Sequence, residues 1–332
     1  MKEVVRDIER WRDRGERFAL ATVVATRRSA PRPVGSKLAV SEGGELAGSV
    51  SGGCVENEVY GVAREVLGGA PPQLLSYGIS DDQALSVGLP CGGEIDVFVQ
   101  EPDPELVERV LGAVAREERA VVLTDLETGE QRLTRDAGLE RGRSRVVELD
   151  GRRMFADVYG PPPRLLVFGA VDTADALCSA AKAIGWRTIV ADARAKFATS
   201  ERIPSADELV VAWPDEVLAQ VRPDHATAVV VLTHDDRFDI PALQGALASE
   251  AFYVGALGSR RNQERRRERL LEAGVAEEAV DRIAGPAGLD IGADTPAETA
   301  LSILAEILAV RAGRVGGPLK EAPGRIHVEV AG

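Results

Sequence analysis

One segment of the chain reads Arg164-Leu165-Leu166-Val167-Phe168-Gly169-Ala170, a short apolar run that ends in glycine. This pattern is typical of a strand that is buried on both faces of a parallel sheet. Similar apolar runs follow at 187–192, 208–213, 228–233 and 252–258, with helical patterns at 173–184 and 241–249. Strands that alternate with helices form right-handed βαβ units, so this half is predicted to be a Rossmann-like, doubly wound parallel sheet.

Pro161, Pro162 and Pro163 stand immediately before this run and indicate a domain boundary, because consecutive prolines continue neither a helix nor a central strand. The preceding half has helical patterns at 8–13 and 55–67, strand patterns at 18–25, 36–40, 45–50, 73–77 and 94–99, and a β-rich stretch at 120–159. The sequence therefore predicts an α/β protein, with an N-terminal α+β domain at 1–160, the Rossmann-like domain at 161–313 and a C-terminal tail at 314–332.

Composition excludes several classes of function. A net charge of −13 over 332 residues argues against a nucleic-acid partner, which normally needs a basic face. The arginine-rich run at 260–269 is the exception, and its alternative interpretation is a solvated helix face. No apolar run has the length of a membrane span, and acidic residues interrupt the amino terminus, so we expect a cytoplasmic protein without a membrane partner. Three cysteines fit a reducing compartment.

Two glycine-rich loops each carry a thiol: Ser51-Gly52-Gly53-Cys54 and Pro90-Cys91-Gly92-Gly93. Cys54 precedes the helical pattern at 55–67, and a helix amino terminus favours the thiolate that metal ligation or sulfur transfer needs. The alternative is a small buried side chain, which is our interpretation of Cys178. Cys54 and Cys91 are candidates for catalysis or for contact with a metal. A zinc site is not expected, because neither cysteine belongs to a CxxC pair and no histidine accompanies them. Cys91 stands 37 positions after Cys54, so the sequence leaves open whether they share a pocket.

Other polar residues suggest anion binding. Ser36 and Lys37, with Arg32 nearby, form a loop that suits a phosphate or is simply an exposed turn. Glu56 and Glu58 follow Cys54 within a helical turn, where acidic side chains complement the helix dipole.

The turn at 169–174 occupies the place of a dinucleotide-binding turn, but only Gly169 and the final alanine fit its G-x-G-x-x-G/A pattern. Val171 replaces the glycine that lets a pyrophosphate approach the backbone, which argues against an NAD(P) cofactor. Asp192 stands 23 positions after Gly169 and fits the acidic residue that binds a ribose hydroxyl.

Two later loops follow strands of the same sheet, where ligands of open parallel sheets bind. His234 and Asp235 lie in the first loop, and His234 is a candidate acid, base or ligand, or else a residue that hydrogen-bonds the loop. The second loop is Gly258-Ser259-Arg260-Arg261, in which Ser259 is predicted to cap a helix whose amino end holds a phosphate with the arginines. Thr295-Pro296-Ala297-Glu298 is typical of a capping box and leaves Gly288, Asp290 and Gly292 unexplained.

These segments together resemble the XdhC/CoxI family, the accessory proteins of molybdenum hydroxylases such as xanthine dehydrogenase and carbon monoxide dehydrogenase. The resemblance spans about residues 15–312 and rests on 35–37, 48–56, 87–93, 233–235, 253–261 and 288–293. Many members have a glycine and a histidine where this chain has Val171 and Asp172, which is its one departure.

The resemblance implies a maturation chaperone rather than an enzyme. Such a protein binds the molybdenum cofactor, as molybdopterin or its dinucleotide, holds it during sulfuration by a cysteine desulfurase, and delivers it to the apo-hydroxylase. The expected cofactor-binding residues are Ser36, Lys37, Gly52, Gly53, Cys54, Cys91, Gly92, Gly169, Asp192, His234, Asp235, Gly258, Ser259, Arg260, Arg261 and Asp290. Cys54 and Cys91 would contact molybdenum, which suits soft thiolate ligands.

Two alternatives remain open at this point. One is an oxidoreductase that binds NAD(P) through the Rossmann-like domain and relays a proton through His234. The other is a non-catalytic subunit that docks on the hydroxylase through an acidic surface. The sequence is also compatible with a homodimer.

Overall fold

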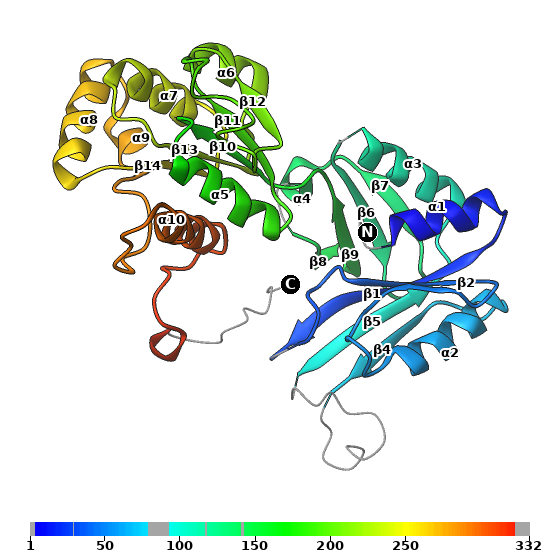
Figure 1. Ribbon diagram of the computed structural model, residues 1–332. Helices are drawn as coiled ribbons and strands as arrows, with labels where there is room; N and C mark the ends of the chain where they lie inside the picture. Colours follow the sequence, from blue (N-terminus) through cyan, green and yellow to red (C-terminus); the bar gives the residue numbers. More distant parts are fainter. Residues whose placement is uncertain (1–3, 29, 79–92, 117, 141–142, 323–332) are drawn as a thin grey trace. The chain divides into compact units, whose positions relative to one another are not determined.

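The computed structural model describes residues 4–28, 30–78, 93–116, 118–140 and 143–322. The chain divides into two compact units, the first within Met1–Pro161 (unit 1) and the second Pro162–Glu321 (unit 2) (Figure 1). Cys91 and Gly92 lie outside the described residues.

Unit 1 contains an antiparallel sheet of order β3-β2-β1-β5-β4. Its strands are β1 (Phe18–Arg27), β2 (Lys37–Ser41), β3 (Leu46–Gly48), β4 (Gln73–Tyr77) and β5 (Glu94–Gln100). Side chains alternate between the two faces of a strand. On one face of β1, Ala19, Ala21 and Val23 pack against α2 (Glu56–Leu67). On the other face, Leu20 lies in the core that contains Trp11 of α1 (Val5–Asp13). The sheet is therefore covered by a helix on each face.

A second antiparallel sheet of unit 1 has the order β7-β6-β9-β8. Its strands are β6 (Ala120–Asp125), β7 (Gln131–Thr134), β8 (Arg145–Leu149) and β9 (Arg152–Tyr159), with the short α4 (Ala137–Glu140) between β7 and β8. Helix α3 (Pro104–Ala115), which was not predicted from the sequence, packs Leu106 and Val110 against β6. Asp103 caps it by accepting a hydrogen bond from the Glu105 amide.

Unit 2 has a six-stranded parallel sheet of order β12-β11-β10-β13-β14-β15. Its strands are β10 (Arg164–Phe168), β11 (Arg187–Ala191), β12 (Glu208–Val210), β13 (Thr227–Val231), β14 (Tyr253–Ala256) and β15 (Ile283–Ala284). Helices cover both faces (Figure 1). One face carries α5 (Asp172–Ala183) and α10 (Pro296–Arg311), and the other carries α6 (Pro214–Val221), α7 (Asp236–Ala248), α8 (Arg260–Glu272) and α9 (Glu277–Val280). The described residues end just after a 3-10 turn at Leu319–Glu321.

The predicted fold class, an α+β region followed by a Rossmann-like sheet, is confirmed by this arrangement. Two predicted helix starts are wrong: α1 begins at Val5 rather than at Ile8, and α7 begins at Asp236 rather than at Pro241. Asp235 caps the helix by accepting the Arg237 amide, so helix formation starts a full turn before the proline. Within the described ranges, no helix combines the length and apolar character needed to cross a bilayer.

Candidate functional site

The Cys54 loop presents its thiol to solvent. Gly52 and Gly53 have φ angles of +79° and +114°, a region that strongly favours glycine. Ser51 is buried, whereas Gly52, Gly53 and Cys54 are exposed. Val55 is the cap residue of α2, so the thiol lies at the amino terminus of that helix, as the sequence predicts.

The carboxylate of Glu56, the first residue of α2, fills the interior of this loop. Its Oε1 accepts hydrogen bonds from Ser49 Oγ at 2.6 Å and from the Ser51 amide at 2.9 Å. The Gly53 amide donates to Oε2 at 2.8 Å, and Ser51 Oγ donates to the same oxygen. The amides of Val50 and Gly52 also donate to Oε1, at 3.2 and 3.1 Å. The loop therefore carries its own anion, and its amides are already satisfied without a bound phosphate.

The ionised form of Glu56 is strongly favoured. Burial by itself would raise the pKa of Glu56, but the hydrogen bonds from Ser49 and Ser51 outweigh it and lower the pKa to about 2. The carboxylate therefore stabilises the loop fully at every pH above about 4.5, the ordinary pKa of a glutamate side chain.

A pH dependence follows from this lowered pKa. We expect Glu56→Gln to unfold at a lower urea concentration than wild type at neutral pH. The difference should shrink as the pH falls from about 4.5 towards about 2, because the wild-type carboxylate then takes up its proton. Urea midpoints measured at several pH values check this. The control is Glu58→Gln, an exposed side chain in the same turn, which should show no comparable loss; a constant gap for Glu56→Gln would contradict the assignment.

The other described cysteine differs from Cys54. Cys178 is fully buried in α5, which confirms its interpretation as a core residue, and burial raises the pKa of its thiol to about 12. Among the described residues there is no group of three or more histidine, cysteine or acidic side chains that could hold a metal ion. The predicted metal contacts of Cys54 and Cys91, and the predicted role of Gly92, stay predictions.

Lys37 is buried rather than exposed in a turn. Its side chain is on β2, the residue is 2% exposed, and Nζ lies 2.5 Å from Oδ2 of Asp157 on β9. The same carboxylate accepts hydrogen bonds from the Tyr159 hydroxyl and, at 3.1 Å, from Ser144 Oγ. This ion pair joins the two sheets of unit 1. Ser36 is half-buried beside it, so the predicted anion-binding role of both residues has no exposed ammonium group to support it.

The turn after β10 is closed by groups of the chain itself. Gly169 has φ +108°, and a Cβ there would lie 2.7 Å from Thr233 Cγ2, so the close approach of the next loop requires glycine. The Ala170 amide donates to Asp192 Oδ2 at 3.0 Å. Arg194 donates to both oxygens of Asp192, at 2.9 and 2.8 Å. Despite burial, these bonds lower the pKa of Asp192, and both of its oxygens are occupied within the chain.

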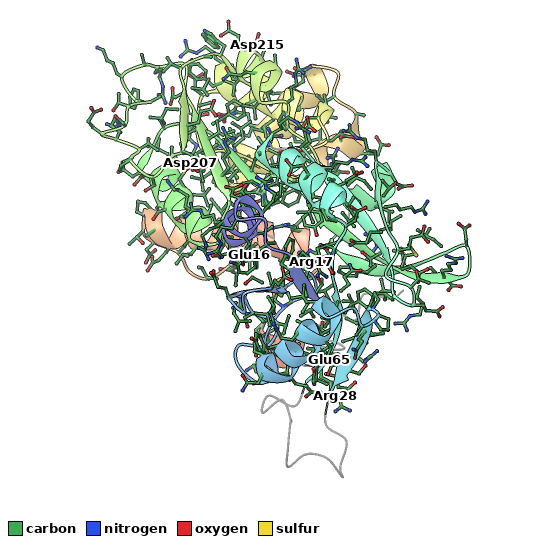
Figure 2. All side chains as sticks on the ribbon, turned by 90° about the vertical axis from the view of Figure 1, so that its right-hand side faces the viewer. Glu16, Arg17, Arg28, Glu65, Asp207 and Asp215 are labelled. Carbon is green, nitrogen blue, oxygen red and sulfur yellow. The ribbon has the colours of Figure 1, made fainter. Side chains whose placement is uncertain are left out.

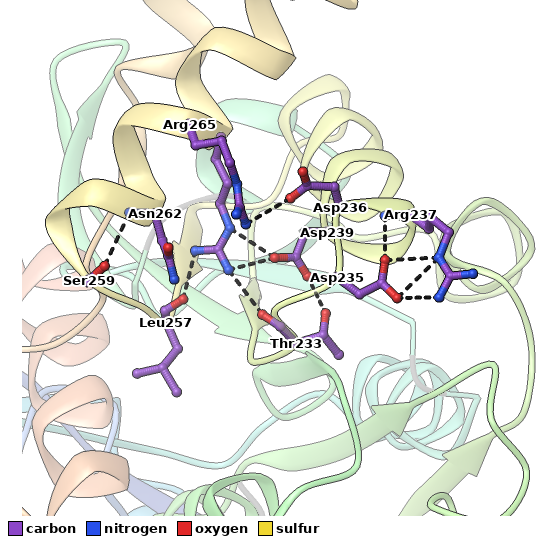
Figure 3. A network of polar contacts seen from close by, with 10 residues as sticks. Thr233, Asp235, Asp236, Arg237, Asp239, Leu257, Ser259, Asn262 and Arg265 are labelled. Atoms are coloured by element: carbon purple, nitrogen blue, oxygen red, sulfur yellow. Dashed lines mark hydrogen bonds and ion pairs between the residues drawn. The ribbon is translucent and has the colours of Figure 1, made fainter.

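A buried ion pair connects the two strand-end loops that the sequence singles out (Figure 3). Arg266 of α8 and Asp239 of α7 are 1% and 0% exposed, and Arg266 Nη2 lies 2.6 Å from Asp239 Oδ2. Arg266 also donates to the backbone oxygens of Leu257 at 2.7 Å and Thr233 at 3.0 Å. Thr233 Oγ1 donates to the other oxygen of Asp239. Burial raises the pKa of Asp239, and Arg266 and Thr233 counteract it.

The remaining candidates of unit 2 lie around this ion pair. His234 is exposed directly after Thr233, and Asp235 caps α7 while pairing with Arg237 at 2.6 Å. The hydrogen bonds from the Arg237 side chain and amide lower the pKa of Asp235 to about 2. Ser259 caps α8 as predicted, by accepting the Asn262 amide at 3.2 Å (Figure 3).

Arg260 and Arg261 occupy the first turn of α8 and are exposed. Among the described residues, neither has an ion-pair partner. Gly258, with φ +145°, lets the chain turn into this helix. The amino end of α8 therefore offers free backbone amides and two guanidinium groups at one place.

Gly288 and Asp290 lie in the loop before α10. A Cβ on Gly288 would lie 2.4 Å from Ser302 Oγ, and the Gly288 amide donates to Glu306 Oε2 at 2.9 Å. Close packing against α10 thus explains why residue 288 is a glycine. Asp290 is exposed to solvent. The predicted capping box of Thr295 and Glu298 is present.

Comparison with known proteins places this arrangement in a family. Residues 11–78 match the model of the XdhC and CoxI family, and residues 165–307 match the model of the XdhC Rossmann domain. A relative from Bacillus subtilis (strain 168), named as a probable xanthine dehydrogenase subunit, is 30% identical over 89% of this chain and 94% of its own length. The chain belongs to the XdhC and CoxI family. The resemblance seen in its motifs is thereby confirmed.

Two further proteins are similar to this XdhC and CoxI family member. The molybdenum cofactor insertion chaperone PaoD of Escherichia coli (strain K12) is 31% identical over 90% of this chain and 84% of PaoD. A crystal structure described as a xanthine dehydrogenase from Bacillus halodurans covers 96% of this chain and 98% of that chain, with 26% identity and a TM-score of 0.70. The whole fold is thus shared with a solved structure.

In this XdhC and CoxI family member, several residues that build the site were not predicted from the sequence. In the sequence, Arg266 is one arginine of a basic run. The feature that indicates its burial is the apolar Leu270, which stands four residues later on the same face of the helix and is also buried. Asp239 is acidic within an apolar helical pattern, which indicates a buried partner. Glu56 was assigned only to the helix dipole.

Proposed function

We propose that this chain is an accessory chaperone that binds the molybdenum cofactor, assists its sulfuration and delivers it to a molybdenum hydroxylase of the xanthine dehydrogenase or carbon monoxide dehydrogenase type. The names of two relatives support this class of function. The observation that carries it is the exposed thiol of Cys54 on the loop that Glu56 holds. Because Glu56 satisfies the loop amides, the thiol is the group that this loop offers to a cargo.

The cargo's chemistry suits such a thiol. Molybdenum in the cofactor is a metal that soft sulfur ligands favour. An exposed cysteine at a helix amino terminus is suited to contact the metal or to handle sulfur during sulfuration. Cys91 is proposed for the same work, with Gly52, Gly53 and Gly92 leaving space for the approach of the cargo.

A separate surface of unit 2 is proposed for the cofactor's phosphate. Free amides at the amino end of a helix and nearby guanidinium groups form an anion site, and α8 offers both through Ser259, Arg260 and Arg261. His234, Asp235 and Gly258 line the adjacent loops. The buried Arg266 holds these loops together but does not reach solvent itself.

The proposed partners are the apo-hydroxylase that receives the cofactor and a cysteine desulfurase that supplies sulfur, and the protein is proposed to act as a homodimer in the cytoplasm. The cargo is proposed to be molybdopterin or its dinucleotide. Lys37 and Asp192 are left outside the proposed binding surface, because their charged groups are occupied within the chain.

Cofactor retention tests both surfaces. We expect Cys54→Ala, and separately the double variant Arg260→Ala/Arg261→Ala, to weaken retention of added molybdenum cofactor by about tenfold, since each removes a charged or metal-directed contact. Retention is measured by gel filtration followed by cofactor fluorescence and metal analysis. The controls are Cys178→Ala, a buried thiol, and Arg269→Ala, at the other end of α8. Wild-type retention in both test variants would contradict the placement.

A further inference from the structure

Unit 2 carries an exposed aromatic cluster that the proposed function does not use. Trp213 and Phe238 stack with ring centroids 4.9 Å apart and planes inclined by 30°. Arg194 lies with its guanidinium carbon 4.2 Å from the ring centre of Phe197 and 5.8 Å from that of Phe238. We call these four residues the aromatic shelf. Trp213 is 48% exposed although one face of its indole contacts Phe238, so a flat aromatic surface remains open to solvent.

The aromatic shelf lies at the carboxyl edge of the parallel sheet. Arg194 and Phe197 follow β11, Trp213 follows β12, and Phe238 is in the first turn of α7 after β13. Figure 2 labels Asp207, which directly precedes the edge strand β12, and Asp215, which lies in the first turn of α6. Ligands of open parallel sheets bind outside this edge.

The shelf is held in place by the chain around it. Arg194 forms two hydrogen bonds from its side chain to Asp192, while its Nη1 has no partner among the described residues. Trp213 precedes Pro214 at the start of α6, and its amide donates to Glu216 Oε2 at 3.3 Å. A fixed flat ring and a fixed guanidinium with a spare donor are therefore both held against Phe238.

Three carboxylates near the shelf are paired, whereas Arg202, whose guanidinium carbon lies 5.2 Å from the ring centre of Phe197, has no ion-pair partner among the described residues. Asp192 pairs with Arg194 at 2.8 Å, Asp235 with Arg237 at 2.6 Å, and Asp236 with Arg265 at 3.1 Å.

We propose that the aromatic shelf binds the nucleobase of a nucleotide, with the base stacked on Trp213 and an oxygen of the base or ribose accepting from Arg194 Nη1. Stacking on an aromatic side chain tolerates any base, because every base has a π-face. The turn after β10 does not take the pyrophosphate, because its Ala170 amide is occupied and Asp172 places a carboxylate at the start of α5. The site therefore holds base and sugar and leaves the phosphate outside that turn, unlike an NAD site.

A nucleobase fits better than a protein partner. A stable protein interface buries roughly 800 Å² on each side, whereas this cluster presents a single exposed indole and the edges of two half-buried phenylalanines. The base belongs either to the dinucleotide form of the cofactor, an assignment that rests on the proposed function, or to a free nucleotide.

Tryptophan fluorescence provides a direct test. Of the three tryptophans, Trp11 and Trp186 are 0% and 5% exposed, so a stacked base quenches Trp213 selectively. We expect AMP, CMP or GMP to quench the emission of the full chain in a saturable way, and ribose 5-phosphate to leave it unchanged. Trp213→Phe should remove the quenching yet keep binding by calorimetry, whereas Trp213→Ala should weaken binding by about tenfold, in line with a lost stacking contact. Trp186→Phe, the matched control, should keep the quenching.

Other outcomes would overturn the proposal. Absence of saturable quenching, equal binding of ribose 5-phosphate, or quenching by a free pterin alone would each exclude a nucleobase site. Loss of cofactor retention in Cys54→Ala leaves this titration unaffected, because the mononucleotides contain no molybdenum, so the two proposals fail independently.

Competition then identifies the source of the base. If the dinucleotide form of the cofactor displaces CMP and the form without a nucleotide does not, the base belongs to the cargo. If neither form displaces it, the shelf binds a free nucleotide. If the form without a nucleotide displaces CMP equally well, the shelf does not recognise a nucleobase and the proposal is wrong.

Discussion

Arg266→Met is expected to destabilise unit 2 by about 3–5 kcal/mol, because it leaves the carboxylate of Asp239 buried without its partner. The methionine keeps much of the side-chain volume, so the loss reports the charge and the hydrogen bonds rather than a cavity. The backbone oxygens of Leu257 and Thr233 lose their donor as well. Urea unfolding of the full chain, followed by the fluorescence of Trp186 and Trp213 in unit 2, measures the effect.

The neighbouring Arg267→Met provides the control. Arg267 lies on the same helix and pairs with Glu277 and Asp281, but its side chain is 37% exposed rather than buried, so its removal should leave the urea midpoint nearly unchanged. Burial already raises the pKa of Asp239, and protonation removes the stranded charge. The loss in Arg266→Met should therefore be smaller at about pH 5 than at about pH 8. Equal midpoints for the two arginine variants would contradict a stabilising role for the buried pair.

Lys37→Met is expected to destabilise unit 1 by about 3 kcal/mol, near the lower end of the range for breaking a buried ion pair. The loss is smaller than for Arg266 because Asp157 still accepts hydrogen bonds from Tyr159 and Ser144. Since Lys37 and Asp157 come from different sheets, the variant should loosen the contact between β2 and β9. The fluorescence of Trp11, measured in a variant whose other tryptophans are phenylalanine, follows the unfolding of unit 1.

Two further variants make the Lys37 result specific. Arg12→Met removes an exposed ion pair with Glu108 in the same unit and should leave the midpoint unchanged. Lys37→Arg keeps the charge but has to fit a larger, planar group beside Tyr159. Cofactor retention by Lys37→Arg that equals wild type, together with a lowered midpoint, would assign Lys37 to the fold. A selective loss of retention at an unchanged midpoint would instead favour the anion-binding role suggested by the sequence.

Strands β10, β11, β13 and β14 of unit 2 were predictable because they are buried on both faces and their sequences are unbroken apolar runs, whereas the two-residue edge strand β15 was not predicted. The ends of the strands were harder to predict. Strand β12 ends at Val210, three residues before the apolar pattern ends, since Trp213 is already the N-cap residue of α6. The predicted start of α7 at Pro241 was too late in the chain, because Asp235 caps the helix and Pro241 lies inside it. Local patterns thus identify an element more reliably than its boundaries.

Prediction of the site succeeded where one residue acts on its own neighbours. Ser259 and Thr295 cap the helices that directly follow them, and both were predicted. Partners distant in the chain were not predicted, as for Lys37 with Asp157, which stand 120 positions apart. A basic side chain looks the same in sequence whether it faces solvent or a buried carboxylate, so the fold alone separates Arg266 from Arg267.

The closed turn after β10 limits which substitutions could turn it into a pyrophosphate site. A glycine at position 171 would not by itself create a pyrophosphate site, because the Ala170 amide would still be bound to Asp192 and Asp172 would still repel phosphate. Replacing Asp192 to free that amide would release Arg194 and with it the stacking on Phe197. No single substitution therefore opens this turn to a pyrophosphate; Val171, Asp172 and Asp192 would have to change together.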